Sequence, residues 1–220
     1  MSAPPVEVTS ETGDRPRRRR LDAAARRQTI LDAAVPLFAT AGYEQTRMSD
    51  VAARVGVTEP VIFQNFGSKA ELFAASLERA SEQAVRYLSG LSDEHGNVHD
   101  WLCHVLATEH LDQLHAAPMF GVLFADAHRL HFDARVHDAL HRSIVLVAEA
   151  MADILRRGQT DGSIRSDAPP LALAWLVVSL IQAREFRRTH TPAASAVLER
   201  GLLARIVETF SPKATARTAR

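Results

Sequence analysis

The chain has few cysteines and aromatic residues and no long apolar run, and these absences exclude several classes of protein. Cys103 is the only cysteine, so neither an intramolecular disulfide nor a cysteine zinc site can form. No apolar run approaches the roughly 20 residues that span a bilayer, and residues 1–20 lack the apolar segment of a signal peptide. Aromatic residues make up only 6% of the chain. These absences predict a cytoplasmic protein that has no membrane partner.

Residues 48–66 carry the most informative pattern that is present. Their apolar residues recur at the spacing of one helix face: Met48, Val51, Ala52 and Val55. Gly56 can end this helix with a positive φ, Thr58 can N-cap a second helix, and Pro60 suits the first turn of that helix. Two short helices joined in this way predict a helix-turn-helix, whose second helix is built for the DNA major groove.

The flanking sequence predicts that this motif belongs to a closed three-helix module. The preceding segment has an apolar stripe at helical spacing, formed by Ile30, Leu31, Ala34, Leu37 and Phe38. Gly42-Tyr43 is expected to end that first helix, which contains Pro36 and is expected to kink there. Ser68 to Glu71 forms a capping box that opens a further helix.

Residues 26–75 resemble the N-terminal DNA-binding domain of the TetR family of bacterial transcriptional regulators. The matching segments are ILDAAVPLFATAGY, MSDVAARVGV and VTEPVIFQNFGSKAELF. The resemblance implies a homodimer that binds a near-palindromic DNA operator. It also implies release of the operator when a small molecule occupies the C-terminal domain, most simply as a repressor.

The composition and the punctuation of the chain predict an all-α fold of about nine helices. Hydrophobic residues make up 46% of the chain, Ala and Leu abound, and no strand-like alternation of useful length occurs. Besides the N-terminal helices, helical segments are expected at 98–116, 118–129, 133–157, 168–188 and 193–210. The predicted divisions are a disordered basic arm (1–20), the helix-turn-helix domain (21–68), a ligand-binding and dimerisation domain (69–211) and a disordered tail (212–220).

Positive charge is concentrated on the predicted DNA-binding module, although the formal net charge of the chain is zero. Residues 15–69 hold ten Lys and Arg against five Asp and Glu, whereas the rest of the chain is mildly acidic. The arm contains Arg17, Arg18, Arg19 and Arg20. It is interpreted either as a solvated tail or as an arm that follows the backbone or enters the minor groove; a contribution to affinity through counterion release is expected.

The family pattern assigns two sets of DNA contacts. The residues expected to face the bases are Glu59, Pro60, Val61 and Gln64; Glu59 could instead serve only the helix dipole. The residues expected at the phosphates are Thr46, Arg47, Ser49, Phe63, Asn65 and Lys69. The sequence departs from the family at two of these, because Phe63 stands where a tyrosine is usual and Asn65 where histidine or tyrosine is usual.

The second domain is expected to supply a ligand pocket and a dimer interface. Candidate pocket residues are Trp101, Phe120, Phe124, Phe132 and Trp175, although Phe and Trp at helical spacing equally describe an ordinary core. Candidate dimer residues are Leu173, Val177, Leu180, Leu202 and Ile206, which could close a four-helix bundle with a second copy or complete the protomer core. No cofactor is expected.

Other functions are compatible with the sequence to different degrees. His128 and His131, and His137 and His141, have the spacing of a metal-ligand pair on a helix, but no third ligand is fixed by spacing, so no metal site is predicted. An enzyme is disfavoured because no nucleophile elbow or phosphate-binding glycine loop is present. An activator, or a DNA-binding protein that responds to no ligand, fits the same sequence.

Overall fold

The computed structural model describes residues 23–116, 121–130, 132–190 and 195–212. Within them the chain is helical and contains no strand, which confirms the predicted all-α class. The helices are α1 (Ala23–Gln45), α2 (Met48–Val55), α3 (Glu59–Phe66), α4 (Lys69–Glu94), α5 (Val98–Val105), α6 (Thr108–Ala116), α7 (Gly121–Arg129), α8 (Ala134–Asp161), α9 (Pro170–Gln182), α10 (Arg184–His190) and α11 (Ser195–Phe210).

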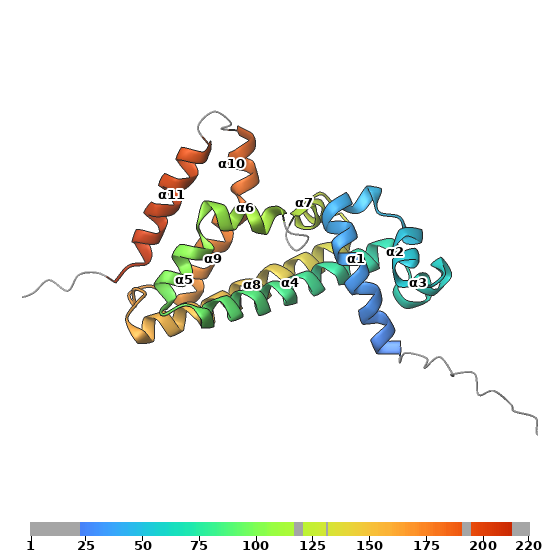
Figure 1. Ribbon diagram of the computed structural model, residues 1–220, viewed down its shortest axis with the longest axis horizontal. Helices are drawn as coiled ribbons and strands as arrows, with labels where there is room; N and C mark the ends of the chain where they lie inside the picture. Colours follow the sequence, from blue (N-terminus) through green and yellow to red (C-terminus); the bar gives the residue numbers. More distant parts are fainter. Residues whose placement is uncertain (1–22, 117–120, 131, 191–194, 213–220) are drawn as a thin grey trace, which may run out of the picture.

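Helices α4 and α8 form the long axis of the molecule. Helices α1, α2 and α3 pack at one end of this pair, and α10 and α11 lie toward the other (Figure 1). The pair makes the most extensive helix–helix contact in the described chain. The N-terminal module is therefore joined to the second domain through the continuous helix α4 and through α8, which packs against α4.

A ladder of ion pairs follows the α4–α8 contact. Glu71 pairs with Arg135 at 2.6 Å and Glu78 with Arg142 at 2.6 Å, and Asp93 pairs with Arg157 at 3.2 Å. The partners are about 64 residues apart in each case. Residue numbers thus rise together along both helices, so α4 and α8 run parallel.

Three boundaries differ from the prediction. The segment expected as one helix at 98–116 is divided into α5 and α6, because Leu106 ends α5 and α6 begins at Thr108. The segment at 168–188 is likewise divided at Ala183. Helix α8 runs past the expected end at 157 until Gly162, which adopts φ 80°, ψ 6°. Apolar periodicity continues through the two interruptions, so it could not reveal them.

Helix α1 continues through Pro36, where a kink was predicted, and the backbone leaves helical dihedral angles at Gly42 instead (φ 78°, ψ 174°). A residue with a Cβ adopts such a positive φ only at a cost, which explains glycine at this point. Tyr43 and the residues after it then turn toward α2. The predicted end of the first helix at Gly42-Tyr43 is thus where its regular geometry stops.

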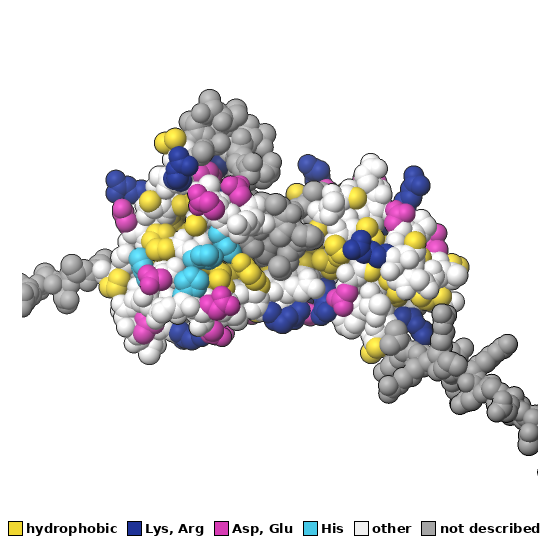
Figure 2. Space-filling model, viewed as in Figure 1, with side chains coloured by type: hydrophobic (Ala, Val, Ile, Leu, Met, Phe, Trp, Pro, Cys, Tyr) yellow, Lys and Arg dark blue, Asp and Glu magenta, His cyan; other side chains and the backbone are white. Residues whose placement is uncertain are grey.

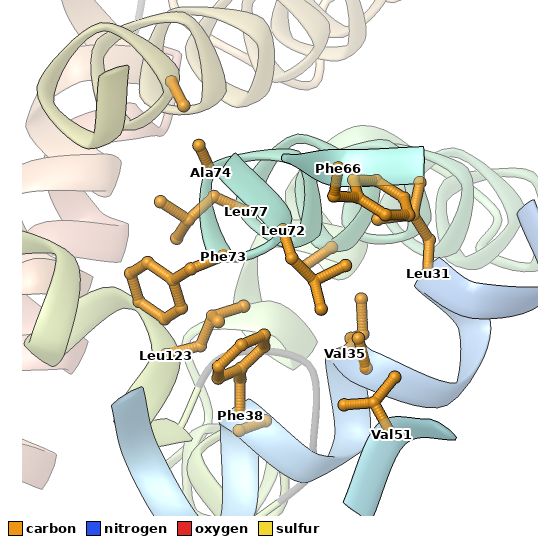
Figure 3. Packing of buried hydrophobic residues seen from close by; sticks show 14 of the residues in the cluster. Leu31, Val35, Phe38, Val51, Phe66, Leu72, Phe73, Ala74, Leu77 and Leu123 are labelled. Carbon is orange, nitrogen blue, oxygen red and sulfur yellow. The ribbon is translucent and has the colours of Figure 1, made fainter. Parts of the chain in front are cut away.

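Two hydrophobic clusters divide the interior. The first joins α1, α2, α3 and α4 and extends to α7 and the start of α8. Leu123 of α7 lies beside Phe38 of α1 and Phe73 of α4 in this cluster (Figure 3). The second cluster fills the space between α4, α5, α8, α9 and α11 around Trp101 and Leu155. Helix α7 therefore belongs to the core of the N-terminal module while lying in the chain segment of the second domain.

Candidate nucleic-acid interface and ligand cavity

The turn between α2 and α3 has the geometry predicted for it. Gly56 adopts φ 74°, ψ 35°, and its N–H donates to the Ala53 carbonyl while the Val57 N–H donates to the Ala52 carbonyl at 3.0 Å. These two bonds satisfy the last carbonyls of α2. Pro60 lies in the first turn of α3. Thr58 differs from the prediction, because its side chain makes no capping hydrogen bond.

Helix α3 is held by two of its residues and offers the rest to solvent. Ile62 and Phe66 are buried in the core of the module. Arg27 of α1 lies over the Phe66 ring, 4.0 Å from its centroid, and donates to the Asn65 carbonyl. A guanidinium at this point complements the negative C-terminal end of the helix. Arg27 was not assigned a role from the sequence; its position depends on a fold contact 38 residues away.

The four residues expected to face DNA bases lie on the uncovered side of α3. Glu59, Pro60 and Gln64 are exposed, and Val61 is half-buried. Ile62 and Phe66 point to the opposite side, so the helix has one anchored face and one free face. This arrangement is that of a recognition helix.

Some of the residues expected to contact phosphates are exposed, and others already make hydrogen bonds within the module. Arg47 and Ser49 are exposed at the N-terminus of α2, and the Arg47 N–H donates to the Asp50 carboxylate at 3.3 Å. Phe63 is 41% exposed. The Asn65 side-chain amide donates to the Val61 carbonyl at 2.7 Å, which leaves it a second N–H.

Thr46 requires a correction. It is buried, and its hydroxyl donates to the Gly42 carbonyl at 2.7 Å. The break of α1 at Gly42 exposes this carbonyl, and Thr46 satisfies it. Its hydroxyl proton is therefore used inside the module and is not available to a phosphate.

Lys69 is held at the first residue of α4 by contacts within the module. Its ammonium group donates to the Glu44 carbonyl at 3.2 Å and lies 4.6 Å from the centroid of the Tyr43 ring. Ser68 caps the same helix by accepting from the Glu71 N–H at 3.1 Å, as predicted. Arg17, Arg18, Arg19 and Arg20 lie outside the described residues.

A small cavity lies inside the second domain, between α4, α8 and α9. It measures about 70 Å³ and is lined mainly by aliphatic side chains. Of the predicted pocket residues, Phe124 lines it, whereas Trp101 is fully buried in the core without lining it. Phe132 and Trp175 are exposed, at 78% and 40%, and Phe120 lies outside the described residues. Ser143 also lines the cavity and was not among the residues predicted to do so.

The predicted dimer residues lie on the inner sides of their helices. Leu173, Val177 and Leu180 of α9 are buried in the protomer's own core, and Leu202 and Ile206 of α11 are packed against it. Their burial favours the alternative that they complete the protomer core. Helix α9 is apolar on two sides, so periodicity alone could not show which of its sides is buried in the protomer. The exposed apolar side chains of these helices are Leu171, Trp175, Leu176, Val197 and Leu198.

Histidines gather on one face over α5 and α6 (Figure 2). The His104 ring lies 5.0 Å from that of His95 and 4.7 Å from that of His110, and His110 stacks on Tyr87. Burial, with His104 and His95 nearby, lowers the pKa of His110. His128, His137 and His141 are exposed on α7 and α8, and His131 lies outside the described residues. Within the described part of the chain no three potential ligands are placed to hold a metal ion.

Comparison with known proteins identifies the module. The family model described as "bacterial regulatory proteins, tetR family" matches residues 30–76, and these residues contain both helices of the motif. The chain belongs to the TetR family. This TetR-family chain is a transcriptional regulator with a DNA-binding helix-turn-helix domain.

Individual relatives extend the match to different lengths. The transcriptional activator FasR of Mycolicibacterium smegmatis is 40% identical over 73 residues, which are 33% of either chain. The transcriptional regulator TtgR of Pseudomonas putida is 27% identical over 191 residues, 76% of this chain and 83% of TtgR. The crystal structure of E. coli NemR shares the fold with a TM-score of 0.68 at 18% identity, over 84% of this TetR-family chain and 98% of NemR.

None of the helices in the described ranges is long and apolar enough to cross a membrane. Cys103 is exposed as a residue, but partial desolvation of its thiol, together with the nearby carboxylate of Asp100, raises the pKa of the thiol. A raised pKa lowers the fraction of reactive thiolate.

Proposed function

We propose that this TetR-family regulator binds a near-palindromic operator as a homodimer, represses transcription there, and leaves the operator when a small molecule binds in its second domain. The observation that carries the proposal is the two-sided helix α3. Ile62 and Phe66 fix one side in the core, and Glu59, Pro60 and Gln64 remain exposed on the other.

The exposed residues of α3 favour particular base contacts. Gln64 suits a bidentate pair with adenine, and Pro60 and Val61 suit thymine methyl groups. Arg47, Ser49 and Lys69 stand at helix N-termini, where N–H groups and the helix dipole attract phosphates. Arg17 to Arg20 add sequence-independent contacts, so removing residues 1–20 reduces the salt dependence of binding.

The exposed apolar side chains of α9 and α11 support a second copy of the chain as partner. Leu171, Trp175 and Leu176 are each at least 40% exposed on α9, and Val197 and Leu198 are more exposed on α11. A dimer would cover them and would give the two recognition helices required by a palindromic operator. Trp175→Glu should yield a monomer in sedimentation, whereas Phe132→Glu, an equally drastic change at an exposed residue, should leave a dimer.

The experiment that tests operator binding is selection of duplex DNA from a random pool at moderate salt. We expect an enriched inverted repeat, and we expect Gln64→Ala to relax the preference at one position of each half-site at a cost of about 1–3 kcal/mol. Arg205→Ala, a change at an exposed residue of α11, is the control and should leave the preference unchanged. Failure to enrich any sequence would contradict specific recognition.

Activation of transcription is the second candidate function. It is favoured by the similarity to FasR, a transcriptional activator that matches 33% of this chain. The sign of regulation depends on where the operator lies relative to the promoter. In vitro transcription from a promoter that carries the selected operator distinguishes the two: added protein lowers the transcript level in repression and raises it in activation.

A further inference from the structure

The cavity of the second domain has a chemically simple wall. Its lining side chains in the described part of the chain carry no charge, and all are apolar except Ser143 of α8 and Gln182 of α9. Gln182 is exposed, whereas Ser143 is only 1% exposed. Transfer of a charged group into such surroundings is strongly unfavourable without a partner charge.

The Ser143 hydroxyl is an unsatisfied group in this wall. No hydrogen-bond partner for its Oγ is found among the described residues. Buried hydroxyl groups are normally paired, and one that is not has lost its bonds to water without replacement. A ligand group that donates to or accepts from Ser143 would restore the missing bond.

The volume of the cavity implies that one wall must move. At about 70 Å³ it is well below the roughly 300–1,000 Å³ of pockets that bind organic ligands. Helices α4 and α9 each pack on α8 more extensively than α7 does. Phe124 of α7 is the largest side chain in the described lining, so its displacement would enlarge the cavity more than that of any other lining side chain.

Movement of α7 would reach the DNA-binding module directly. Helix α7 packs mainly on α1. Leu123, the neighbour of Phe124, lies beside Phe38 and Phe73 in the core of that module (Figure 3). Asp126, two residues after Phe124, accepts a hydrogen bond from the backbone N–H of Tyr43. Adjacent residues of one short helix thus contact the cavity and the core of the DNA-binding module.

We propose that the effector is an uncharged, largely apolar compound with one hydrogen-bonding group, which pairs with Ser143 and displaces Phe124. This inference rests on the ligand-released regulator proposed above and specifies the chemistry of its ligand. Because the described lining side chains carry no charge, the cavity disfavours carboxylates and amines of the same size.

The test uses three probes that differ only in their head group: octan-1-ol, octanoate and octylamine, titrated calorimetrically into the full chain at pH 7.5. We expect octan-1-ol to bind at least tenfold more tightly than either charged probe. Ser143→Ala should weaken octan-1-ol about fivefold, the loss of one net hydrogen bond, while raising the melting temperature of the free protein. Ser179→Ala, a change at an exposed serine of α9 that does not line the cavity, is the matched control.

A second variant tests the moving wall. Phe124→Ala removes the ring that must be displaced, so octan-1-ol should bind several-fold more tightly to it than to the wild type. Equal binding of octanoate and octan-1-ol, unchanged binding to Ser143→Ala, or no binding of octan-1-ol up to its solubility would overturn the proposal.

Operator binding measured on the same samples keeps the two proposals separate. An operator that is bound, with no octan-1-ol binding, contradicts the ligand class and leaves DNA recognition intact. Selective octan-1-ol binding without release of the operator supports the ligand class and contradicts ligand-driven release. Failure to bind the operator at all contradicts the proposed function alone.

Discussion

The backbone N–H of Tyr43 donates a hydrogen bond to Asp126 Oδ2 at 2.6 Å, which joins α1 to α7 across 83 residues. The amide follows the break at Gly42, and the carboxylate is also paired with Arg129 at 3.3 Å. Asp126 is 13% exposed at its side chain, so water competes weakly for the bond. This contact ties the end of α1, just before the helix-turn-helix, to the helix that lines the cavity.

Asp126→Ala should destabilise the protein and loosen the link between cavity and DNA-binding module. A hydrogen bond to a charged group contributes about 1.5–3 kcal/mol, and urea unfolding measures the loss. Asp126→Asn keeps an acceptor oxygen and should lose less. Equal losses for the two variants would show that the charge, through Arg129, matters more than the bond to Tyr43.

Two glycines on long helices should respond to alanine in opposite directions. At Gly158 of α8 an added Cβ would lie 2.7 Å from Val98 Cβ and 2.5 Å from Ile164 Cγ1, so α8 could not approach α5 as closely. We expect Gly158→Ala to cost about 1–3 kcal/mol. At Gly90 of α4 nothing lies within 4 Å, and Gly90→Ala should stabilise the helix by up to about 1 kcal/mol. Thermal unfolding of both variants distinguishes packing from helix propensity.

The ion-pair ladder between α4 and α8 should contribute modestly to stability. Glu78→Arg sets two guanidinium groups against each other at Arg142, and because both side chains are well exposed the cost is about 0.5 kcal/mol. The double variant Glu78→Arg, Arg142→Glu recreates the pair and should recover most of that loss. A double variant no more stable than the single one would indicate that the ladder acts through packing.

Acid should destabilise the protein through His110. Its pKa in the folded state lies below the ordinary value of 6.5, first because the imidazole is buried and second because His104 and His95 lie nearby. The unfolded chain therefore binds a proton more readily than the folded one, so stability falls as the pH drops below about 6.5.

His110→Phe keeps a ring against Tyr87 and removes the titration. Its melting temperature should fall less between pH 7.5 and pH 5.5 than that of the wild type. His137→Phe, a change at an exposed histidine, should behave as the wild type does. Identical pH profiles for all three proteins would assign the acid sensitivity to other groups.

The sequence by itself determined the local elements of the DNA-binding module. Met48 to Phe66 encode two short helices through apolar spacing, and Gly56 and Pro60 mark their boundaries, because helix ends depend on residues within a few positions of one another. Glu59, Pro60 and Gln64 were expected to face DNA, and they are exposed on the side of α3 opposite the buried Ile62 and Phe66.

Only the tertiary structure decided which of several equivalent residues serve each role. Leu173 and Val177 face the protomer core, and Trp175 and Leu176 face solvent, because the neighbouring helices cover just one side of an α9 that is apolar on both. The Thr46 hydroxyl donates its hydrogen bond to the carbonyl of Gly42, the residue at which the regular geometry of α1 breaks. Contacts between distant segments place Ser143 and Phe124 in the cavity wall and join Tyr43 to Asp126. The spacing of residues along the chain does not predict such contacts.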